Sequence, residues 1–296
     1  MSEDKGAPVG RVGLTAAPHK QRALEFVGRL VQALLARGCE VVVDEQAAGG
    51  GGCSAAQVAP LTVCAQTDLL LALGGDGTLL RAARVVAPCG TPLLGVDLGS
   101  FGFLAEEDPD HLLGNLERLL AGDYMVEPRL LLQAQVNGAT AEPGALALND
   151  VVVMRRQSQH PVRLRTTLDG AHIATYPADG VIVATATGST AYNLSAGGPI
   201  LDSRMQALVI TPICSHTLYS RPLVVPAEVA IGVRVESRGW GDEGVCVTAD
   251  GQESTALGAG QELLIRRAPW AVRLVRLQPA RFYDRLREKL RWGAER

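Results

Sequence analysis

Apolar residues follow two different spacings along the first 120 residues of the chain. Short continuous apolar runs, which are typical of buried strands, alternate with stretches in which apolar residues recur every three or four positions, as on one face of a helix. The strand-like runs are 12–17, 39–45, 69–73 and 91–99, and the helical stretches are 21–37, 79–86 and 111–120. This alternation predicts an α/β domain with a parallel sheet and helices on its faces.

Glycines mark two places in this first part at which a helix or strand is expected to end. Gly38 follows the first helical stretch, at the place where a glycine commonly ends a helix. The segment 47–54, AAGGGGCS, has few side chains that could pack, so we expect a flexible loop there.

Beyond about residue 124 the runs become short and alternating, with Gly, Pro, Asp and Asn between them. This pattern predicts an antiparallel, all-β domain of sandwich type, in which only 189–196 has brief helical spacing. The last segment places Phe282, Leu286 and Leu290 on one face of an amphipathic helix, which we expect to pack back against the other elements. We therefore predict three parts: 1–124, α/β; 125–278, β-rich; and 279–296, a C-terminal helix.

Composition narrows the class of protein. A length of 296 residues fits two domains of about 150 residues each, and 47% hydrophobic with 20% charged residues indicates a compact soluble protein. A net charge of -3 lacks the basic field of a nucleic-acid binder. No apolar run approaches the about 20 residues of a membrane span, and the N-terminus lacks a signal-peptide pattern. We expect no nucleic-acid or membrane partner and a cytoplasmic location.

The six cysteines form no CxxC pair and no Cys/His cluster at zinc spacing, so we expect reduced, mostly buried thiols and no dedicated metal site. Glycine is the unusual residue, at 33 of 296 positions against about 7% in average proteins. The informative glycines lie in two short segments that also carry polar side chains.

The first of these segments, Gly74-Gly75-Asp76-Gly77-Thr78, follows an apolar run and opens a helical stretch. Backbone N–H groups of such a turn can approach a phosphate closely, and the helix N-terminus favours an anion. The turn matches neither the Walker A nor the GxGxxG pattern. A carboxylate is unfavourable beside phosphate unless it binds a metal or takes a proton from an attacking hydroxyl, so Asp76 points to phosphoryl transfer. The alternative is a tight turn whose Asp caps the next helix.

The second segment, 178–199, combines a β-branched run, a hydroxyl-rich turn and a glycine pair. Its hydroxyl groups suit hydrogen bonding to a heterocycle or a ribose, although a capped helix would use the same residue types. These hydroxyls belong to Thr187, Ser189, Thr190, Tyr192 and Ser195. Asn149-Asp150, between two apolar runs, fits either a ligand contact or a simple turn.

The order of the motifs is more specific than any one of them. GGDGT, LND, TGSTAYNLSAGGPI, SHTLYSRPLVVP at 215–226 and ADGQE at 249–253 follow one another as in bacterial NAD kinases, which the sequence resembles over essentially its whole length. GGDG alone also occurs in diacylglycerol-kinase-like and phosphofructokinase-like enzymes. TGSTAY followed by SAGGP is much more specific.

This resemblance implies transfer of the terminal phosphoryl group of ATP, or in some members polyphosphate, to the 2′-hydroxyl of the adenosine ribose of NAD. It implies that Asp76 is the base on that hydroxyl and that Gly74, Gly75, Gly77 and Thr78 form the phosphate-binding turn. The NAD contacts that it implies are Asp76, Gly77, Arg81, Asn149, Asp150, His160, Asp179, Thr190, Ala191, Tyr192, Asn193, Leu194, Ser195 and Gln252. A surface histidine is the alternative for His160, because its surroundings have no distinctive pattern.

The resemblance also assigns regions of the ligand. Asn149 and Asp150 match a pair that holds ribose and neighbouring groups, Asp179 matches an acidic residue at the nicotinamide end, and 190–195 match adenine and ribose contacts. We expect both glycine-containing segments to meet the dinucleotide. We also expect a divalent cation, Mg²⁺ or Mn²⁺, to arrive with ATP, and a homodimer or homotetramer.

The sequence departs from the family pattern at four places. Ala186 replaces the proline of TPTGSTAY, Asp97 the asparagine of NLG, and Ser215 the proline of PHTL. Pro177 stands two residues before Asp179, where NAD-selective members often carry a basic residue, so the choice between NAD and NADH stays open. Two other functions also stay open: a lipid kinase of the diacylglycerol-kinase-like group, and a module that senses NAD(P) without turnover.

Overall fold

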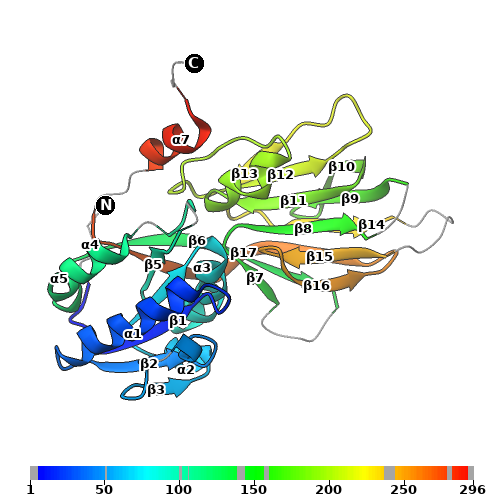
Figure 1. The fold of residues 1–296 in the computed structure, drawn as a ribbon. Helices are drawn as coiled ribbons and strands as arrows, with labels where there is room; N and C mark the ends of the chain where they lie inside the picture. The colour runs from blue at the N-terminus through cyan, green and yellow to red at the C-terminus, as the bar shows by residue number, and fades with distance from the viewer. Residues whose placement is uncertain are drawn as a thin grey trace. The chain divides into compact units, whose positions relative to one another are not determined.

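The computed structural model describes residues 6–50, 52–99, 102–105, 107–138, 144–156, 160–236, 244–278 and 282–292. The chain forms two compact units (Figure 1). Unit 1 contains Met1–Pro128 and Ala271–Arg296, and unit 2 contains Arg129–Trp270. Unit 2 is therefore an insertion within unit 1, and the C-terminal segment 279–296 belongs to unit 1 together with 271–278.

Unit 1 is an α/β domain around parallel strands in the order β3-β2-β1-β4-β5, as the alternating pattern predicted. The final part of β17 pairs in parallel with β5 through Leu274 and Leu93. The strands are β1 (Arg11–Ala16), β2 (Glu40–Asp44), β3 (Gln57–Ala59), β4 (Leu69–Gly74), β5 (Leu93–Asp97) and β17 (Glu262–Arg276). The helices are α1 (Gln21–Leu35), α2 (Leu61–Cys64), α3 (Asp76–Val86), α4 (Pro109–Gly114), α5 (Leu116–Leu120) and α7 (Phe282–Leu290), with short 3-10 turns at Ala48–Gly50 and Ala87–Cys89.

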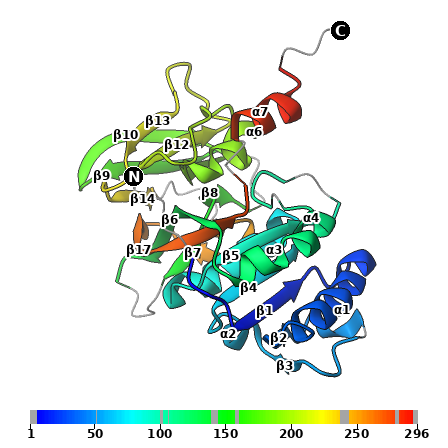
Figure 2. The ribbon, with the colours of Figure 1, turned by 90° about the vertical axis from the view of Figure 1, so that its left-hand side faces the viewer.

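Helices cover both faces of these parallel strands. α1 runs beside β1 and β2 (Figure 2), and its buried Leu30 and Leu34 share one apolar cluster with Leu14 and Leu71. Gly38, with a φ of 77°, turns the chain after α1, as predicted. On the opposite face, a side chain at Gly95 would collide with Leu79 of α3, so the absence of a side chain there lets α3 lie close to the sheet.

Two predictions about local structure in unit 1 are wrong. The described residues of the segment 47–54 are anchored at both ends, because Ala47 and Cys53 are buried in the main apolar cluster. A Cβ at Gly52 would lie 3.0 Å from the Cα of Gly28, so this segment lies directly against α1. The predicted helix 111–120 begins earlier and divides at Asn115, whose φ of -115° and ψ of 14° are not helical.

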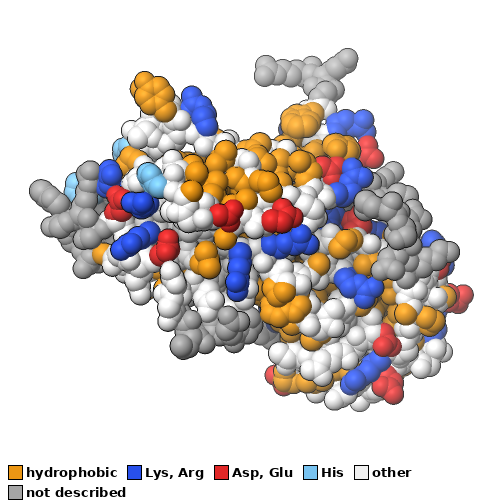
Figure 3. All heavy atoms as spheres, turned by 180° about the vertical axis from the view of Figure 1, so that it is seen from behind, with side chains coloured by type: hydrophobic (Ala, Val, Ile, Leu, Met, Phe, Trp, Pro, Cys, Tyr) orange, Lys and Arg blue, Asp and Glu red, His pale blue; other side chains and the backbone are white. Residues whose placement is uncertain are grey.

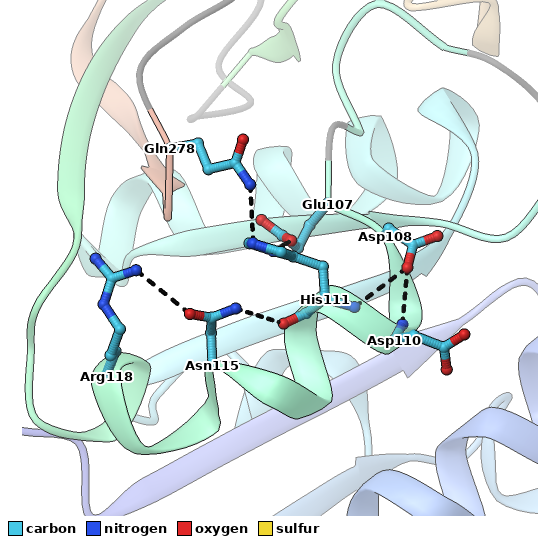
Figure 4. Close-up of polar contacts among 7 residues, drawn as sticks. All are labelled: Glu107, Asp108, Asp110, His111, Asn115, Arg118 and Gln278. Atoms are coloured by element: carbon cyan, nitrogen blue, oxygen red, sulfur yellow. Dashed lines mark hydrogen bonds and ion pairs between the residues drawn. The ribbon is translucent and has the colours of Figure 1, made fainter.

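Side-chain hydrogen bonds explain where α4 begins and ends (Figure 4). The Asp108 carboxylate accepts the N–H groups of Asp110 and His111 at 2.9 and 3.2 Å, which is an N-cap arrangement. The Asn115 side-chain amide donates to the His111 carbonyl at 2.8 Å and ends the helix. The His111 ring bonds to Glu107 through Nδ1 and to the Gln278 amide through Nε2, so it also ties α4 to the chain that follows β17.

Unit 2 is β-rich and sandwich-like, as predicted. One antiparallel sheet has the order β13-β12-β11-β8-β15-β16, and the first part of β17 joins a second set with the order β10-β9-β14-β17, next to β6 and β7. The strands are β6 (Met125–Val136), β7 (Ala145–Ala147), β8 (Asp150–Arg155), β9 (Val162–Leu168), β10 (Ala171–Ala178), β11 (Gly180–Thr185), β12 (Ala207–Ile213), β13 (Leu223–Pro226), β14 (Ile231–Val235), β15 (Val245–Ala249) and β16 (Gln252–Leu257). The predicted brief helical spacing corresponds to a 3-10 turn, Thr187–Thr190, and α6 (Tyr192–Ser195).

The core of unit 2 lies between the two sets of strands. Val151 and Val183 of the first sheet share one buried cluster with Val233 and Ile265 of the second. A separate cluster that includes Ile182 covers the other face of the first sheet. Both faces of β8, β11 and β12 are therefore buried, which explains why these strands appear in the sequence as continuous apolar runs.

Acidic and basic side chains are interspersed on the face of the molecule that Figure 3 shows. Within the described part of the chain, no helix is long and apolar enough to cross a membrane.

Candidate active site

The carboxylate of Asp76 lies where β4 ends and α3 begins. It does not cap α3, because its oxygens accept backbone N–H groups from a different segment, 103–105. The Phe103 N–H donates to Oδ2 at 2.8 Å, and those of Leu104 and Ala105 donate to Oδ1 at 3.1 and 3.3 Å. The alternative of a simple helix cap is therefore wrong.

Two glycines leave room around this carboxylate. A Cβ built on Gly102 would overlap the Asp76 carboxylate, so this position accepts no side chain while Asp76 stays in place. A Cβ built on Gly77 would meet no heavy atom within 4 Å, so the start of α3 has open space beside it. Gly74 and Gly75 precede Asp76, and Thr78 packs against the position that a side chain of Gly74 would occupy.

A second polar cluster lies at the carboxyl ends of β1 and β2. The Arg81 guanidinium reaches back from α3 and contacts the buried Asp44 carboxylate at 2.8 Å. Arg81 also donates to Thr15 Oγ1 and to Gln46 Oε1, both at 2.6 Å. β1 has β2 on one side and β4 on the other, so the strand order reverses direction at β1. In open α/β sheets, ligands commonly bind at the carboxyl ends of the strands where the order reverses.

The C-terminal helix contacts the segment that holds Asp76. Arg285 of α7 donates to the carbonyls of Phe103 and Ala105 at 3.5 and 3.3 Å. The Lys289 ammonium lies 4.2 Å from the centre of the Phe103 ring, a cation–π distance. Burial lowers the pKa of Lys289, and the charge of Asp76 opposes that change. The expected packing of the C-terminal helix against other elements therefore takes place within unit 1.

In unit 2 the structure brings the LND and TGST motifs together. The Thr185 N–H donates to the Asn149 carbonyl at 2.8 Å, and Thr185 Oγ1 donates to the Leu148 carbonyl at 2.6 Å. A Cβ on Gly188 would overlap the Asn149 main chain, so only glycine permits this approach. Asn149-Asp150 thus lies directly beside the hydroxyl-rich turn.

Asp150 is nearly inaccessible, with 4% of its surface exposed. Its pKa is raised to about 7, first by burial and then by the negative charge of Asp250. Asp250 accepts the N–H groups of Leu148, Asn149 and Asp150 at 2.9, 2.7 and 3.2 Å.

The residues 190–195 fall into two groups. Tyr192 is 40% exposed, Ser195 is exposed, and Thr190, Ala191 and Leu194 are half-buried. Asn193 is completely buried, and its amide bonds to the carbonyls of Ser189 and Pro199 and to Thr211. The side chain of Asn193 therefore holds the turn, whereas that of Tyr192 faces solvent.

The remaining predicted contacts lie at three other places in unit 2. Asp179 forms an ion pair with Arg155, with 2.9 Å between Oδ1 and Nε. Gln252 is half-buried at the start of β16, directly after the Asp250 turn. His160 is exposed on a bend before β9.

Several contributors to these sites were absent from the sequence prediction. They are the backbone of 103–105, the Asp44 partner of Arg81, the carboxylate of Asp250, and the two α7 side chains. Each acts across a long separation in sequence, which local spacing does not reveal. The one available signal was the motif itself, because GFL at 102–104 and DGQ at 250–252 both stand within segments that resemble the family.

Known proteins with similar sequences cover both units. The model of the ATP-NAD kinase N-terminal domain matches residues 12–124, and that of the ATP-NAD kinase C-terminal domain matches 148–277. The chain belongs to the NAD kinase family. The NAD kinase of Moorella thermoacetica is 45% identical over 286 residues, which are 97% of this chain and 91% of that protein. The NAD kinase of Geotalea daltonii is 39% identical over 96% of this chain and 99% of its own.

Solved structures of NAD kinases share the fold. Yeast NADH kinase complexed with NADH is 26% identical, with a TM-score of 0.88 over 98% of this chain and 89% of that one. An NAD kinase from Archaeoglobus fulgidus in complex with ATP is 26% identical, with a TM-score of 0.75 over 95% of this chain and 98% of that one. The chain is thus a phosphotransferase of the NAD kinase type, which decides against the lipid-kinase alternative.

Proposed function

We propose that this NAD kinase transfers the terminal phosphoryl group of ATP to the 2′-hydroxyl of the adenosine ribose of NAD, with Asp76 as general base. The observation that carries the proposal is the Asp76 carboxylate, which stands at the start of α3 without capping it and is held by three backbone N–H groups. A similar structure binds ATP and another binds NADH, which supports these two substrate classes.

The hydrogen bonds of Asp76 are compatible with a base. A carboxylate offers about four lone-pair sites, and Oδ2 receives the Phe103 N–H. Oδ2 therefore retains capacity for a ribose hydroxyl. A hydroxyl is a poor nucleophile at neutral pH, so removal of its proton contributes about 10²- to 10⁴-fold, and alignment of donor and acceptor supplies much of the rest.

The glycine turn is the proposed binding place of the donor phosphates. We infer that the N–H groups at the start of α3 face the phosphates and that Gly77 leaves space for them. No group of three or more His, Cys, Asp or Glu side chains among the described residues could hold a metal ion. A divalent cation, Mg²⁺ or Mn²⁺, would therefore be held mainly by phosphates and water, where it neutralises their charge.

The proposed contacts with NAD are the residues that the sequence resemblance implies. Arg81, held by Asp44, is one of them, and Asn149, Asp150 and Tyr192 are others. Thr190, Ala191, Leu194, Ser195, Asp179, His160 and Gln252 remain proposed contacts, whereas for Asn193 we propose a structural role. A homo-oligomer and a cytoplasmic location also remain predictions, and light scattering on the purified protein tests the first.

The decisive variant is Asp76→Asn. Without a base, kcat should fall at least about 100-fold, with a modest change in the KM for NAD. Asp68→Asn is the matched control, because Asp68 precedes the same strand β4 and its carboxylate also accepts two backbone N–H groups, at 2.8 and 2.9 Å. Near-native kcat in folded Asp76→Asn would remove Asp76 as the base.

The substrates are tested by incubating the pure protein with Mg-ATP or polyphosphate and with NAD, NADH or a lipid acceptor, and by assaying NADP(H). We expect NADP from ATP and NAD. NADH is included because Pro177 replaces the usual basic residue. Tight NAD binding without product would instead indicate a sensing module.

A further inference from the structure

Two hairpins of unit 2 turn through the same dipeptide. Asp169-Gly170 joins β9 to β10, and Asp250-Gly251 joins β15 to β16. The φ values are 48° and 82° in the first turn and 52° and 66° in the second, so both residues of each turn are left-handed, as tight hairpins require. Asp tolerates this region better than most residues. The two turns are therefore equivalent in backbone chemistry.

Their side chains differ in what they bind. Asp169 accepts one N–H, from Ala230 at 2.9 Å, in an exposed position. Asp250 is 9% exposed and accepts three consecutive N–H groups, with that of Asn149 at 2.7 Å as the shortest. The Asp250 N–H also donates to the Asp150 carbonyl at 2.9 Å. The backbone of Leu148–Asp150 is thus fixed by the Asp250 turn.

The opposite side of this backbone is fixed by Thr185, the last residue of β11, and by Gly188 of the TGST motif. Thr185 bonds to the carbonyls of Leu148 and Asn149, and Gly188 lies against the Asn149 main chain. The N–H groups of the segment therefore point to Asp250, and two of its carbonyls point to Thr185. Loss of Asp250 would leave buried N–H groups without their acceptor, so the segment would have to shift.

Charge links Asp250 to Asp150 as well. The Asp250 carboxylate accepts three N–H groups of this backbone, and its negative charge opposes ionisation of Asp150. Tyr192 of α6 also interacts electrostatically with Asp150, and burial, Cys214, Asp150 and Asp179 raise the pKa of Tyr192. Ala184 of β11 lies opposite Asp150, and Ala249 of β15 lies opposite the next residue, Val151; neither of them carries a charge.

We propose that Asp250 is the positioning residue of the Asn149–Asp150 pair: its carboxylate holds this backbone in the conformation that receives the NAD ribose and controls whether Asp150 carries a proton there. The inference rests on the proposed function, because it takes Asn149 and Asp150 as NAD contacts. Asp250 contacts the backbone of Asn149 and Asp150, and it would act on the ligand through that backbone.

The test compares Asp250→Asn with Asp169→Asn. Asparagine keeps the left-handed turn, but it removes the charge and leaves one acceptor oxygen for three N–H groups. We expect Asp250→Asn to weaken NAD binding, measured by calorimetry, at least about tenfold. Asp169→Asn should leave the affinity unchanged. Equal affinities in the two variants would overturn the positioning role.

A pH profile separates positioning from loss of structure. Removal of the neighbouring negative charge makes Asp150 easier to ionise, so the midpoint of the pH dependence of NAD affinity should fall by at least about half a pH unit in Asp250→Asn. In an Asp150→Asn background, Asp250→Asn should produce no further shift of this midpoint. A midpoint that stays at the wild-type pH, or a shift that persists without Asp150, would overturn the electrostatic part.

A measurement without NAD keeps this result independent of the proposed function. Between pH 5 and 8, the melting temperature of the wild-type protein without NAD should fall more steeply than that of Asp250→Asn, because Asp150 ionises at higher pH in the wild type. If the wild-type protein neither binds NAD nor forms NADP, the proposed function fails. The two melting curves then still test the electrostatic effect of Asp250 on Asp150, and equal slopes would overturn this effect.

Discussion

Asp76 owes its position to a loop rather than to the helix that it opens. Each of its two oxygens accepts at least one N–H group of 103–105, and the absence of a side chain at Gly102 leaves room for the carboxylate. A carboxylate held in this way cannot rotate freely, so the structure fixes the direction from which a hydroxyl can approach. In phosphoryl transfer, alignment of this kind matters as much as basicity.

Gly102→Ala tests this positioning. Its Cβ would overlap the Asp76 carboxylate, so Asp76 must move or the loop must open. We expect kcat to fall at least about tenfold, since small displacements of reacting groups are costly, while calorimetry should show near-native NAD affinity. Gly114→Ala is the control, because a Cβ there meets no heavy atom within 4 Å. Unchanged kcat in Gly102→Ala would show that the loop adapts without disturbing Asp76.

Tyr192 tests the second predicted segment. Its ring is partly exposed and its neighbour Asn193 is fixed in the core, so truncation should affect a ligand more than the fold. Tyr192→Ala should weaken NAD binding measured by calorimetry, whereas Tyr192→Phe should retain most of the affinity if the ring face makes the contact. If both variants bind NAD as the wild-type protein does, this residue is not a contact.

At the scale of elements, α7 supports the loop that holds Asp76. Arg285 binds two carbonyls of the loop and Lys289 covers the Phe103 ring. The N–H groups of the same residues face Asp76. The loop is thus held from both sides, by Asp76 and by α7. These contacts of α7 act on Asp76 only indirectly, through the loop.

The double variant Arg285→Ala/Lys289→Ala should therefore lower kcat by about three- to tenfold, through a looser loop, with little change in NAD affinity. Arg287→Ala is the matched control, because Arg287 lies on the same helix and pairs only weakly with Asp284 at 3.5 Å. Steady-state kinetics with ATP and NAD measure both. A kcat equal to that of the control would mean that the loop keeps its place without α7.

The helices and strands that could be predicted are those in which the spacing of apolar residues along the chain indicates the type of element. β4 is completely buried, so its apolar run was clear, and α1 has an uninterrupted apolar face. β3 and α2 have three and four residues, too few for a period to emerge. The division of α4 from α5 depends on one side chain, Asn115, that bonds back to the helix.

At the scale of the whole molecule, stability should depend on pH through Asp150. Its pKa is near 3.8 when unfolded and about 7 in the folded protein, so the folded state binds the proton more tightly. Stability from this group is present below about pH 4 and is lost as the pH rises through about 7. Burial also raises the pKa of Glu107, so Glu107 contributes to the pH dependence of stability in the same direction as Asp150.

Asp150→Asn should remove this contribution, because the amide resembles the protonated acid. At pH 8 the free energy of unfolding of the variant should exceed that of the wild type by at least about 1 kcal/mol, and the two should converge toward pH 4. Denaturant unfolding at both pH values measures this difference. A parallel pair of pH curves would show that Asp150 ionises normally in the folded protein.

The site itself was predicted only in part. The motifs placed Asp76, Asn149-Asp150 and the TGST turn, because glycines and polar residues stand out between apolar runs. Their partners could not be found in this way, since Arg81 meets Asp44 across 37 positions and Asp250 meets Asn149 across 101. Only the folded backbone brings such pairs together.

The return of the chain to unit 1 has a consequence for how the protein is made. Val275 and Leu277 belong to the apolar cluster of unit 1, and the buried Arg276 pairs with Glu127 and donates to the Leu104 carbonyl. A ribosome delivers these residues, and α7, only after all of unit 2 has been synthesised. The segment that anchors Asp76 therefore gains its last supports at the end of translation, and a nascent chain carries Asp76 long before it can hold this side chain in place.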